Sequence, residues 1–198
     1  QKNMKDQAEH DLLSGVYNHA TYERICTEYA EKEEGGLVYV MVDIDNFKTL
    51  NDTKGHHAGD EIIRHIGSVL KTEVKGCGYA GRMGGDEFSA FFYNMKSKDE
   101  VLGKCLKIKD NLSGAMGLTP FTVSIGVAMS MDRKMSFKEL YFEADEAVYF
   151  AKENGKNQII FKDEVLKKKE DRMIKSRGEY ALTEEEIALD QKLQYIAI

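Results

Sequence analysis

The sequence predicts an α/β protein of the α+β kind, with helices flanking a mixed, mainly antiparallel central sheet. Helix-like and strand-like segments alternate over most of the chain, and residues 81–92 form a strand–turn–strand pattern between two predicted helices. The chain of 198 residues is long enough to bury one sizeable core. One domain with an appendage accounts for this length.

The order of elements follows from the spacing of apolar residues. A continuous apolar run at 37–42 is typical of a central strand that is buried on both faces. Leu102 is expected to point inward from a helix, and Gly155 is expected to end one. Beyond the hairpin, strands are predicted at 121–130 and 158–162, and helices at 9–33 (after an initial turn), 58–74, 98–112 and 136–154.

Charge and composition exclude several classes of protein. The formal net charge of −6 argues against a general binder of nucleic acid or of anionic membranes. No stretch resembles a transmembrane span or a secretion signal. Cys26, Cys77 and Cys105 are odd in number and widely spaced, which indicates reduced thiols without chemistry and a cytoplasmic location.

The stretch GRMGGDEFSAFF, residues 81–92, combines two glycines with two acids. Adjacent glycines between apolar residues predict a hairpin turn, because glycine tolerates positive φ. Asp86 and Glu87 stand side by side at the tip, where their carboxylates repel each other. Either solvent screens the pair or a positively charged group binds there.

A second acidic position, Asp43, stands at the end of the buried strand. Neighbouring strands can bring Asp43 and Asp86 together at one edge of the sheet, where carboxylate oxygens suit Mg²⁺. Two such ions can bind a triphosphate and polarise the attacking and leaving oxygens. The alternative is that these acids are solvated or cap nearby helices.

The run DIDNFKTLNDTKGHHAGDE at 43–61, taken with the hairpin, resembles the signature of the GGDEF family of diguanylate cyclases. DLLSGVYN at 11–18, FTVSIGVA at 121–128 and ADEAVYFAKENGKN at 144–157 resemble the opening and closing segments of the family. The resemblance covers residues 11–162. It implies a palm-like nucleotidyl-cyclase fold, an enzyme of bacterial second-messenger signalling, and the condensation of two GTP molecules into cyclic di-GMP with release of two pyrophosphates.

The resemblance also implies a site for two Mg²⁺ or Mn²⁺ ions. Asp43, Asp86 and the backbone carbonyl of Ile44 correspond to the metal ligands of the family. Asp86 corresponds to the residue that activates the ribose 3′-hydroxyl, and Glu87 completes the negative cluster. A carboxylate beside a divalent ion can orient that alcohol and help to remove its proton.

Asn51 and Asp60 correspond to the residues that select guanine. A carboxylate accepts hydrogen bonds from guanine N1–H and the exocyclic amino group, whereas adenine has no N1 proton to donate. His56 corresponds to a residue near the nucleotide, and its alternative interpretation is a histidine in the turn before a helix.

Three lysines, Lys48, Lys152 and Lys156, correspond to contacts with phosphate. The family usually has arginine where Lys156 stands, and lysine keeps the charge without the bidentate fork. Arg82, just before the glycines, is expected to be structural or to lie at a dimer contact.

One departure from the family pattern lies just before the hairpin. Many members carry R-x-x-D there, where the product binds and inhibits, and this chain has KGCG at 75–78 instead. Because the arginine fork and the carboxylate are both missing, we expect weak or absent product inhibition.

The leading interpretation is an active diguanylate cyclase that works as a homodimer of domains, because a 3′-hydroxyl held by one subunit must reach the α-phosphate held by the other. The alternative is a catalytically silent GTP-binding module that regulates a neighbouring domain, against which Asp43, Asp86 and Glu87 weigh. A receptor for the dinucleotide is disfavoured by KGCG, and a mixed or adenine-containing product is disfavoured by Asp60.

The chain divides into three predicted parts. Residues 1–10 are expected to end an upstream linker helix, residues 11–162 to form the catalytic domain, and residues 163–198 to form a charged, helical extension or linker. Because the chain begins with Gln1, we expect an upstream sensory region in a larger protein, including a membrane-anchored one. Neither nucleic acid nor direct membrane contact is expected for this segment.

Overall fold

The computed structural model describes residues 8–32, 35–113, 117–131, 133–165 and 167. The chain divides into two compact units, residues 1–163 and 164–198, and every strand and helix named below belongs to the first unit. The predictions of an upstream helix at 1–10 and of a helical tail at 163–198 fall almost entirely outside the described residues.

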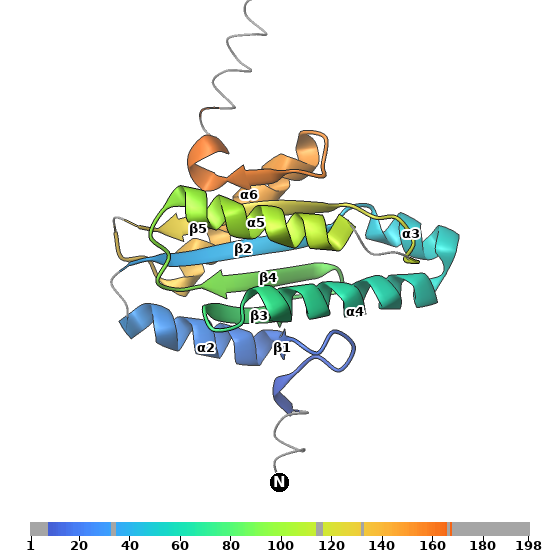
Figure 1. Ribbon diagram of the computed structural model, residues 1–198, viewed down its shortest axis with the longest axis horizontal. Coiled ribbons are helices and arrows are strands. Elements are labelled where there is room, and N and C mark those ends of the chain that lie inside the picture. The colour runs from blue at the N-terminus through green and yellow to red at the C-terminus, as the bar shows by residue number, and fades with distance from the viewer. Residues whose placement is uncertain (1–7, 33–34, 114–116, 132, 166, 168–198) are drawn as a thin grey trace, which may run out of the picture. The chain divides into compact units, whose positions relative to one another are not determined.

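A six-stranded mixed sheet forms the centre of the first unit (Figure 1). Its strand order is β1-β3-β4-β2-β5-β6. The β1/β3 and β5/β6 pairs are parallel, and the three pairs between them are antiparallel, which confirms the predicted mixed sheet. The strands are β1 (Tyr17–Asn18), β2 (Leu37–Ile44), β3 (Gly78–Arg82), β4 (Glu87–Phe92), β5 (Val123–Ser130) and β6 (Ile159–Phe161).

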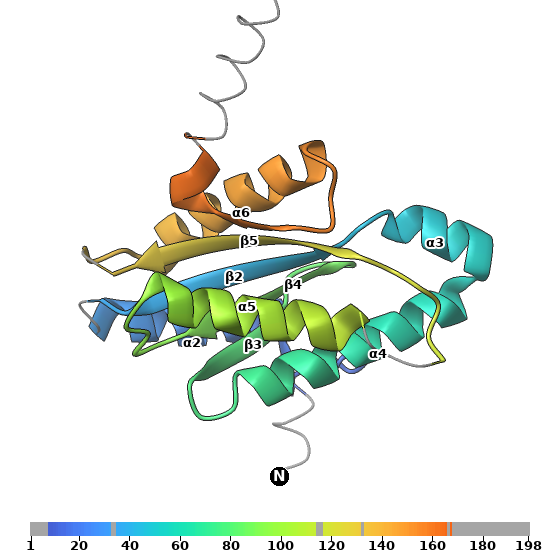
Figure 2. The same cartoon turned by 45° about the horizontal axis from the view of Figure 1, so that its top comes forward.

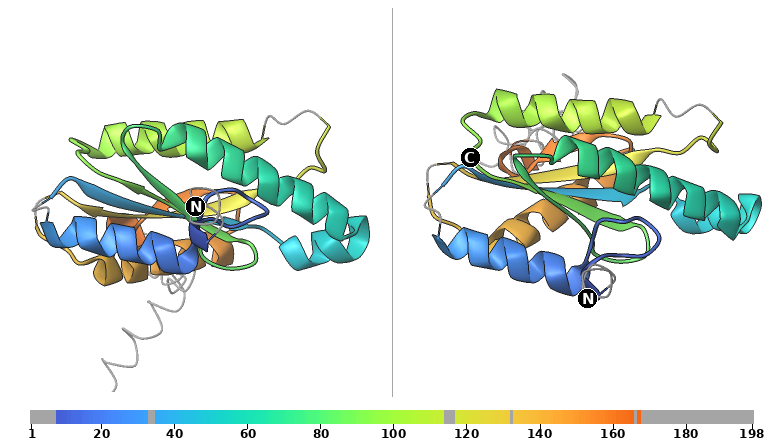
Figure 3. Two further views of the ribbon diagram at one scale, coloured as in Figure 1. Left: turned by 90° about the horizontal axis from the view of Figure 1, so that it is seen from below. Right: turned by 60° about the horizontal axis from the view of Figure 1, so that its bottom comes forward.

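Helices cover both faces of this sheet, so the domain has three layers. Helices α4 and α5 pack on one face, and α2 and α6 pack on the other (Figure 3). Helix α3 lies beyond the end of β2 (Figure 2). The helices are α2 (His19–Lys32), α3 (Phe47–Lys54), α4 (His56–Glu73), α5 (Lys98–Ser113) and α6 (Phe137–Glu153).

Strand β2 is buried along its whole length, as its continuous apolar run predicts. Its side chains alternate between the two faces of the sheet. Val40 and Val42 belong to the core beneath α4 and α5, whereas Tyr39 and Met41 belong to the core beneath α2 and α6. The same alternation directs Asp43 to the side of the sheet that α6 covers.

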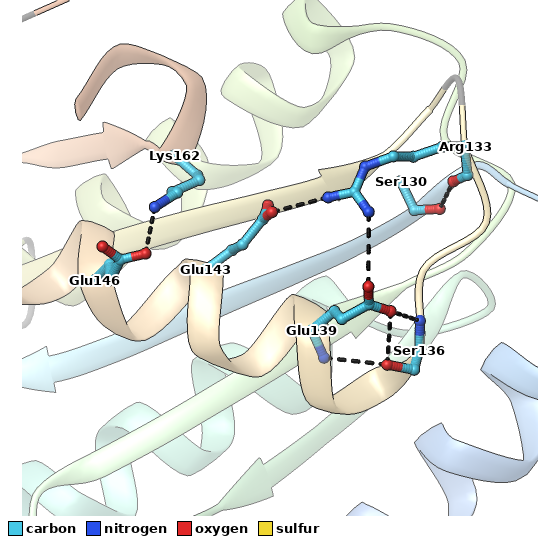
Figure 4. Close-up of polar contacts among 7 residues, drawn as sticks. All are labelled: Ser130, Arg133, Ser136, Glu139, Glu143, Glu146 and Lys162. Carbon is cyan, nitrogen blue, oxygen red and sulfur yellow. Dashed lines mark hydrogen bonds and ion pairs between the residues drawn. The ribbon is translucent and has the colours of Figure 1, made fainter. Parts of the chain in front are cut away.

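Several local features agree with the sequence. Ser136 begins α6 with a capping box, in which its hydroxyl accepts from the Glu139 N–H and the Glu139 carboxylate accepts from the Ser136 N–H (Figure 4). Gly155 has φ of +104° just after the end of α6 and is the predicted helix stop. All three cysteines are free.

Other features differ from the sequence-based predictions. Tyr17 and Asn18 form the short strand β1 instead of a turn, and Phe47–Lys54 form the separate helix α3. Leu102 is 36% exposed on α5, so its predicted inward position is wrong, while Val101 and Cys105 on the same helix are buried. No helix in the described ranges is long and apolar enough to cross a membrane.

Candidate functional site

The site is centred on Asp43, near the end of β2. This residue is 3% exposed, and its Oδ1 atom is buried with no hydrogen-bond partner among the described residues. Burial raises the pKa of Asp43 to about 6; Lys152 acts against this rise, and the negative charges of Asp86 and Glu87 add to it. A buried carboxylate with one unused oxygen is well placed to bind a cation.

Lys152 supplies the nearest positive charge. It lies in the last turn of α6, and its Nζ atom is 2.6 Å from Asp43 Oδ2. Its side chain is 37% exposed, so the ammonium lies between the buried acid and solvent. The sequence predicts a phosphate contact for Lys152, and this ion pair with Asp43 is a contact that the sequence does not reveal.

The hairpin brings the other two acids to the same place. Glu87, the first residue of β4, stands opposite Asp43 in the antiparallel register of β2 and β4. The Ile44 N–H donates to the carbonyl oxygen of Asp86 at 3.3 Å. The structure therefore places Asp43, Asp86 and Glu87 at one end of the sheet, although their segments are far apart in the chain.

Arg82 holds the tip of this hairpin. Its Nε donates to the Gly84 carbonyl at 3.1 Å and its Nη2 to the Gly85 carbonyl at 2.7 Å. Its Nη1 lies 3.0 Å from Asp11 Oδ1, and the same oxygen accepts from the N–H and hydroxyl of Ser14. Arg82 thus has a structural role, which is one of the two that the sequence predicts.

Gly84 and Gly85 do not serve the turn in the way that the sequence predicts, which is by adopting positive φ. Neither Gly84 nor Gly85 has positive φ, so left-handed backbone is not the reason for glycine here. A Cβ atom on Gly85 would meet nothing within 4 Å, and one on Gly84 would lie 3.2 Å from Glu87 Oε2. The pair leaves the backbone beside the acids bare, which gives a ligand room to approach.

Asp45 is a buried residue whose role the sequence analysis missed. Its carboxylate accepts hydrogen bonds from the Thr122 and Ser124 hydroxyls, each at 2.6 Å, and from the Asn157 N–H at 3.0 Å. It therefore joins the end of β2 to the start of β5 and to the turn after α6. Asp43 and Asp45 are two residues apart, a spacing that places both on one face of an extended strand, so no pattern in the sequence separates their roles.

Lys156 lies in that same turn. Its Nζ donates to Asn46 Oδ1 at 2.5 Å, and both residues have positive φ. This contact places Lys156 next to the loop that follows β2. Lys152 and Lys156 therefore reach the end of β2 from the same segment of the chain.

Asn51 and Asp60 lie on the two helices that follow β2. Asn51 Oδ1 is buried without a hydrogen-bond partner in the described part of the chain. A Cβ atom on Gly59 would lie 2.0 Å from this oxygen, so only glycine allows Asn51 to pack against the residue before Asp60. Within the described ranges no hydrogen bond or ion pair connects Asp60, Lys48 or His56 to another candidate residue, and the last two are exposed.

The donor chemistry fits a magnesium ion, although no group of three or more His, Cys, Asp or Glu side chains in the described residues is arranged as a metal site. The acids at this end of the sheet are Asp43, Asp86 and Glu87, and Lys152 is bound to one Asp43 oxygen. The unused Oδ1 of Asp43 and the nearby Asp86 are hard oxygen donors.

A large cavity lies elsewhere. It has a volume of about 880 Å³ between α2 and the first half of α6, and its lining includes Met83, Phe137 and Tyr141 but none of the candidate site residues. The candidate chemistry therefore lies at the end of the sheet and not in this cavity.

A mixed sheet with acids at one end and helices on both faces is the arrangement of a palm-like fold. The sequence model of the family described as "Diguanylate cyclase, GGDEF domain" matches residues 8–158. The chain therefore belongs to the GGDEF diguanylate cyclase family.

Similar proteins agree with this family. The chain is 35% identical over 170 residues to the uncharacterized protein YtrP of Bacillus subtilis, covering 82% of this chain and 28% of YtrP. It is 28% identical to the probable diguanylate cyclase DgcT of Escherichia coli, covering 81% of this chain and 37% of DgcT. The chain thus spans less than half the length of these relatives.

Solved structures share the fold. The coiled coil and GGDEF domain of DgcB from Caulobacter crescentus, in complex with c-di-GMP, superimposes with a TM-score of 0.74 at 26% identity, covering 81% of this chain and 88% of that one. The diguanylate cyclase SiaD of Pseudomonas aeruginosa, in complex with its activator SiaC, gives a TM-score of 0.69 at 25% identity over 81% of this chain and 64% of SiaD.

Proposed function

We propose that this domain is an active diguanylate cyclase, which joins two GTP molecules into cyclic di-GMP. The observation that carries the proposal is the buried Asp43 carboxylate, with one unused oxygen, beside Asp86 and Glu87 on the neighbouring hairpin. Three acids at the end of a sheet are costly unless cations bind there. Their presence in this chain favours catalysis over a silent module.

Asp43, Asp86 and the Ile44 carbonyl would hold Mg²⁺ or Mn²⁺, which supplies Lewis-acid stabilisation of phosphate charge when bound. Asp86 orients the ribose 3′-hydroxyl and accepts its proton. The 3′-oxygen of each GTP attacks the α-phosphorus of the other, and each of the two attacks releases one pyrophosphate. Glu87 adds negative charge beside Asp86.

The remaining candidate residues bind the nucleotide. Asn51 and Asp60 pair with guanine, and the buried, unpartnered Asn51 Oδ1 is an acceptor for its amino group. Lys48, Lys152 and Lys156 offset phosphate charge, and His56 lies near the nucleotide. Two copies of the domain must face each other, because each supplies one GTP.

The test is to incubate the purified chain with GTP and Mg²⁺ at several protein concentrations and to identify the product by mass spectrometry. We expect cyclic di-GMP, with a rate that rises more steeply than linearly with protein concentration. Asp86→Ala should abolish turnover while its circular dichroism stays unchanged, and the exposed Asp110→Ala should retain turnover. GTP binding without product in the wild-type chain would instead support a silent regulatory module.

A further inference from the structure

Lys152 is bound to one of the two oxygens through which Asp43 can bind a cation. Its Nζ is 2.6 Å from Asp43 Oδ2, while Oδ1 has no hydrogen-bond partner among the described residues. Asp86 and Glu87 bring two more negative charges close to Asp43. Because an unpaired buried carboxylate is costly, the contact with Lys152 lowers the free-energy cost of a charged Asp43 when no other cation is bound.

The position of Lys152 lets its ammonium change partners. The residue lies in the last turn of α6, its side chain is 37% exposed, and its flexible stem carries a point charge. Asp43, by contrast, is fixed near the end of a central strand, β2, which is hydrogen-bonded to a neighbouring strand on each side. Any rearrangement of the pair therefore moves the lysine and leaves the acid in place.

We propose that Lys152 is a displaceable counter-ion of Asp43, which excludes a divalent ion until nucleotide phosphates draw the lysine away. A divalent ion on Asp43 Oδ2 and the ammonium would repel each other at this distance. The phosphates of the incoming nucleotide offer Lys152 another anion. The inference rests on the proposed function and adds a specific consequence: metal alone binds weakly, and nucleotide and metal strengthen each other's binding by the same factor.

The experiment measures Mn²⁺ binding to the 198-residue chain by the electron paramagnetic resonance of free Mn²⁺, with and without a GTP analogue in which methylene replaces the α–β bridging oxygen, and subtracts the Mn²⁺ that the analogue binds in the absence of protein. Lys152→Met removes the charge and keeps most of the stem, and Lys152→Arg keeps the charge. Lys162→Met is the matched control. Lys162 forms an ion pair with Glu146, which lies on α6 as Lys152 does (Figure 4), and the substitution changes the net charge by the same amount. The titrations are run at pH 8, since the pKa of Asp43 rises further without Lys152.

We expect Lys152→Met to bind Mn²⁺ alone roughly tenfold or more tightly than the wild type. Lys152→Arg and Lys162→Met should remain close to the wild type. The analogue should raise Mn²⁺ affinity strongly in the wild type and much less in Lys152→Met.

Two results would contradict us in different ways. If the wild type binds Mn²⁺ with the analogue, but Lys152→Met binds Mn²⁺ alone no better than Lys162→Met, the counter-ion role is wrong and the proposed function stands. If none of the four proteins binds Mn²⁺ with the analogue, the proposed function is wrong, and the inference with it.

Discussion

Arg82 and Asp11 lie 71 positions apart in the chain, yet their side chains form an ion pair of 3.0 Å. Burial acts to raise the pKa of Asp11, but hydrogen bonds from Ser14 and from Arg82 outweigh it, so this pKa is lowered. Through the other donors of Arg82, the pair joins the opening loop of the domain to the carbonyls of Gly84 and Gly85. The acids that follow these glycines are therefore positioned by a contact with the start of the domain.

Replacing Arg82 with lysine should lower kcat strongly and lower the free energy of unfolding only moderately. Lysine keeps the charge but has no fork to reach both glycine carbonyls and Asp11 together. We expect kcat to fall roughly ten- to a hundredfold through misplacement of Asp86, and the free energy of unfolding to fall by about 1–3 kcal/mol. Pyrophosphate release and urea unfolding measure the two effects. Arg64→Lys, on the exposed side of α4, is the control, and unchanged turnover in Arg82→Lys would show that the contact is not needed.

Asp45→Ala should weaken phosphate binding, although Asp45 itself is not one of the proposed phosphate contacts. The variant leaves the hydroxyls of Thr122 and Ser124 and the Asn157 N–H without their acceptor. We expect a loss of about 1–3 kcal/mol in the free energy of unfolding. Because the turn that carries Lys156 loses its anchor, the affinity for a GTP analogue, measured by calorimetry, should fall as well. A drop in stability with unchanged affinity would mean that Asp45 supports the sheet alone.

Asp43 should make the fold less stable as the pH rises, which is the opposite of an ordinary ion-paired carboxylate. Burial raises its pKa from 3.8 to about 6, so the folded protein retains a proton that the unfolded chain has lost between these values. The free energy of unfolding therefore falls as the pH rises from 3.8 to about 6, by roughly 3 kcal/mol once Asp43 is fully ionised.

Asp43→Asn isolates this contribution. In EDTA, the variant should be more stable than the wild type at pH 7.5, and the two should converge near pH 4. Urea unfolding at a series of pH values measures the difference. A variant that is less stable than the wild type at pH 7.5 would show that the ion pair with Lys152 outweighs the burial of the charge.

The chain should bind cyclic di-GMP weakly at the position of the missing R-x-x-D motif. Lys75 is exposed, and Gly78 begins β3 where a Cβ atom would lie 2.1 Å from the Phe91 carbonyl oxygen. Gly78→Asp should therefore disturb the pairing of β3 and β4 and lower stability by about 1–3 kcal/mol, without restoring a product site. Calorimetry with cyclic di-GMP tests both proteins, and submicromolar binding that survives Lys75→Ala would contradict the prediction.

The sequence was sufficient wherever an element carries its own pattern. Strand β2 follows from an uninterrupted apolar run, and the end of α6 follows from Gly155, whose positive φ L side chains rarely adopt. The sequence was insufficient where a short helix lies within a signature motif and has no apolar pattern of its own. Helix α3 lies inside the signature run and has only 8 residues before its C-cap at Gly55, which has φ of +85°. A helix this short shows no long apolar period in the sequence.

By itself the sequence determined the family and the mixed sheet, because these depend on local patterns of apolar, acidic and glycine residues, and it predicted the candidate site residues. Only the tertiary structure decided which charges meet. The pairs Asp43–Lys152 and Asp11–Arg82, and the three bonds to Asp45, join segments far apart in the chain. Their physical causes are tertiary contacts. The pairing of β2 with β5 brings the Thr122 and Ser124 hydroxyls to Asp45, the packing of α6 on these two strands brings Lys152 to Asp43, and the pairing of β1 with β3 brings the opening loop to Arg82.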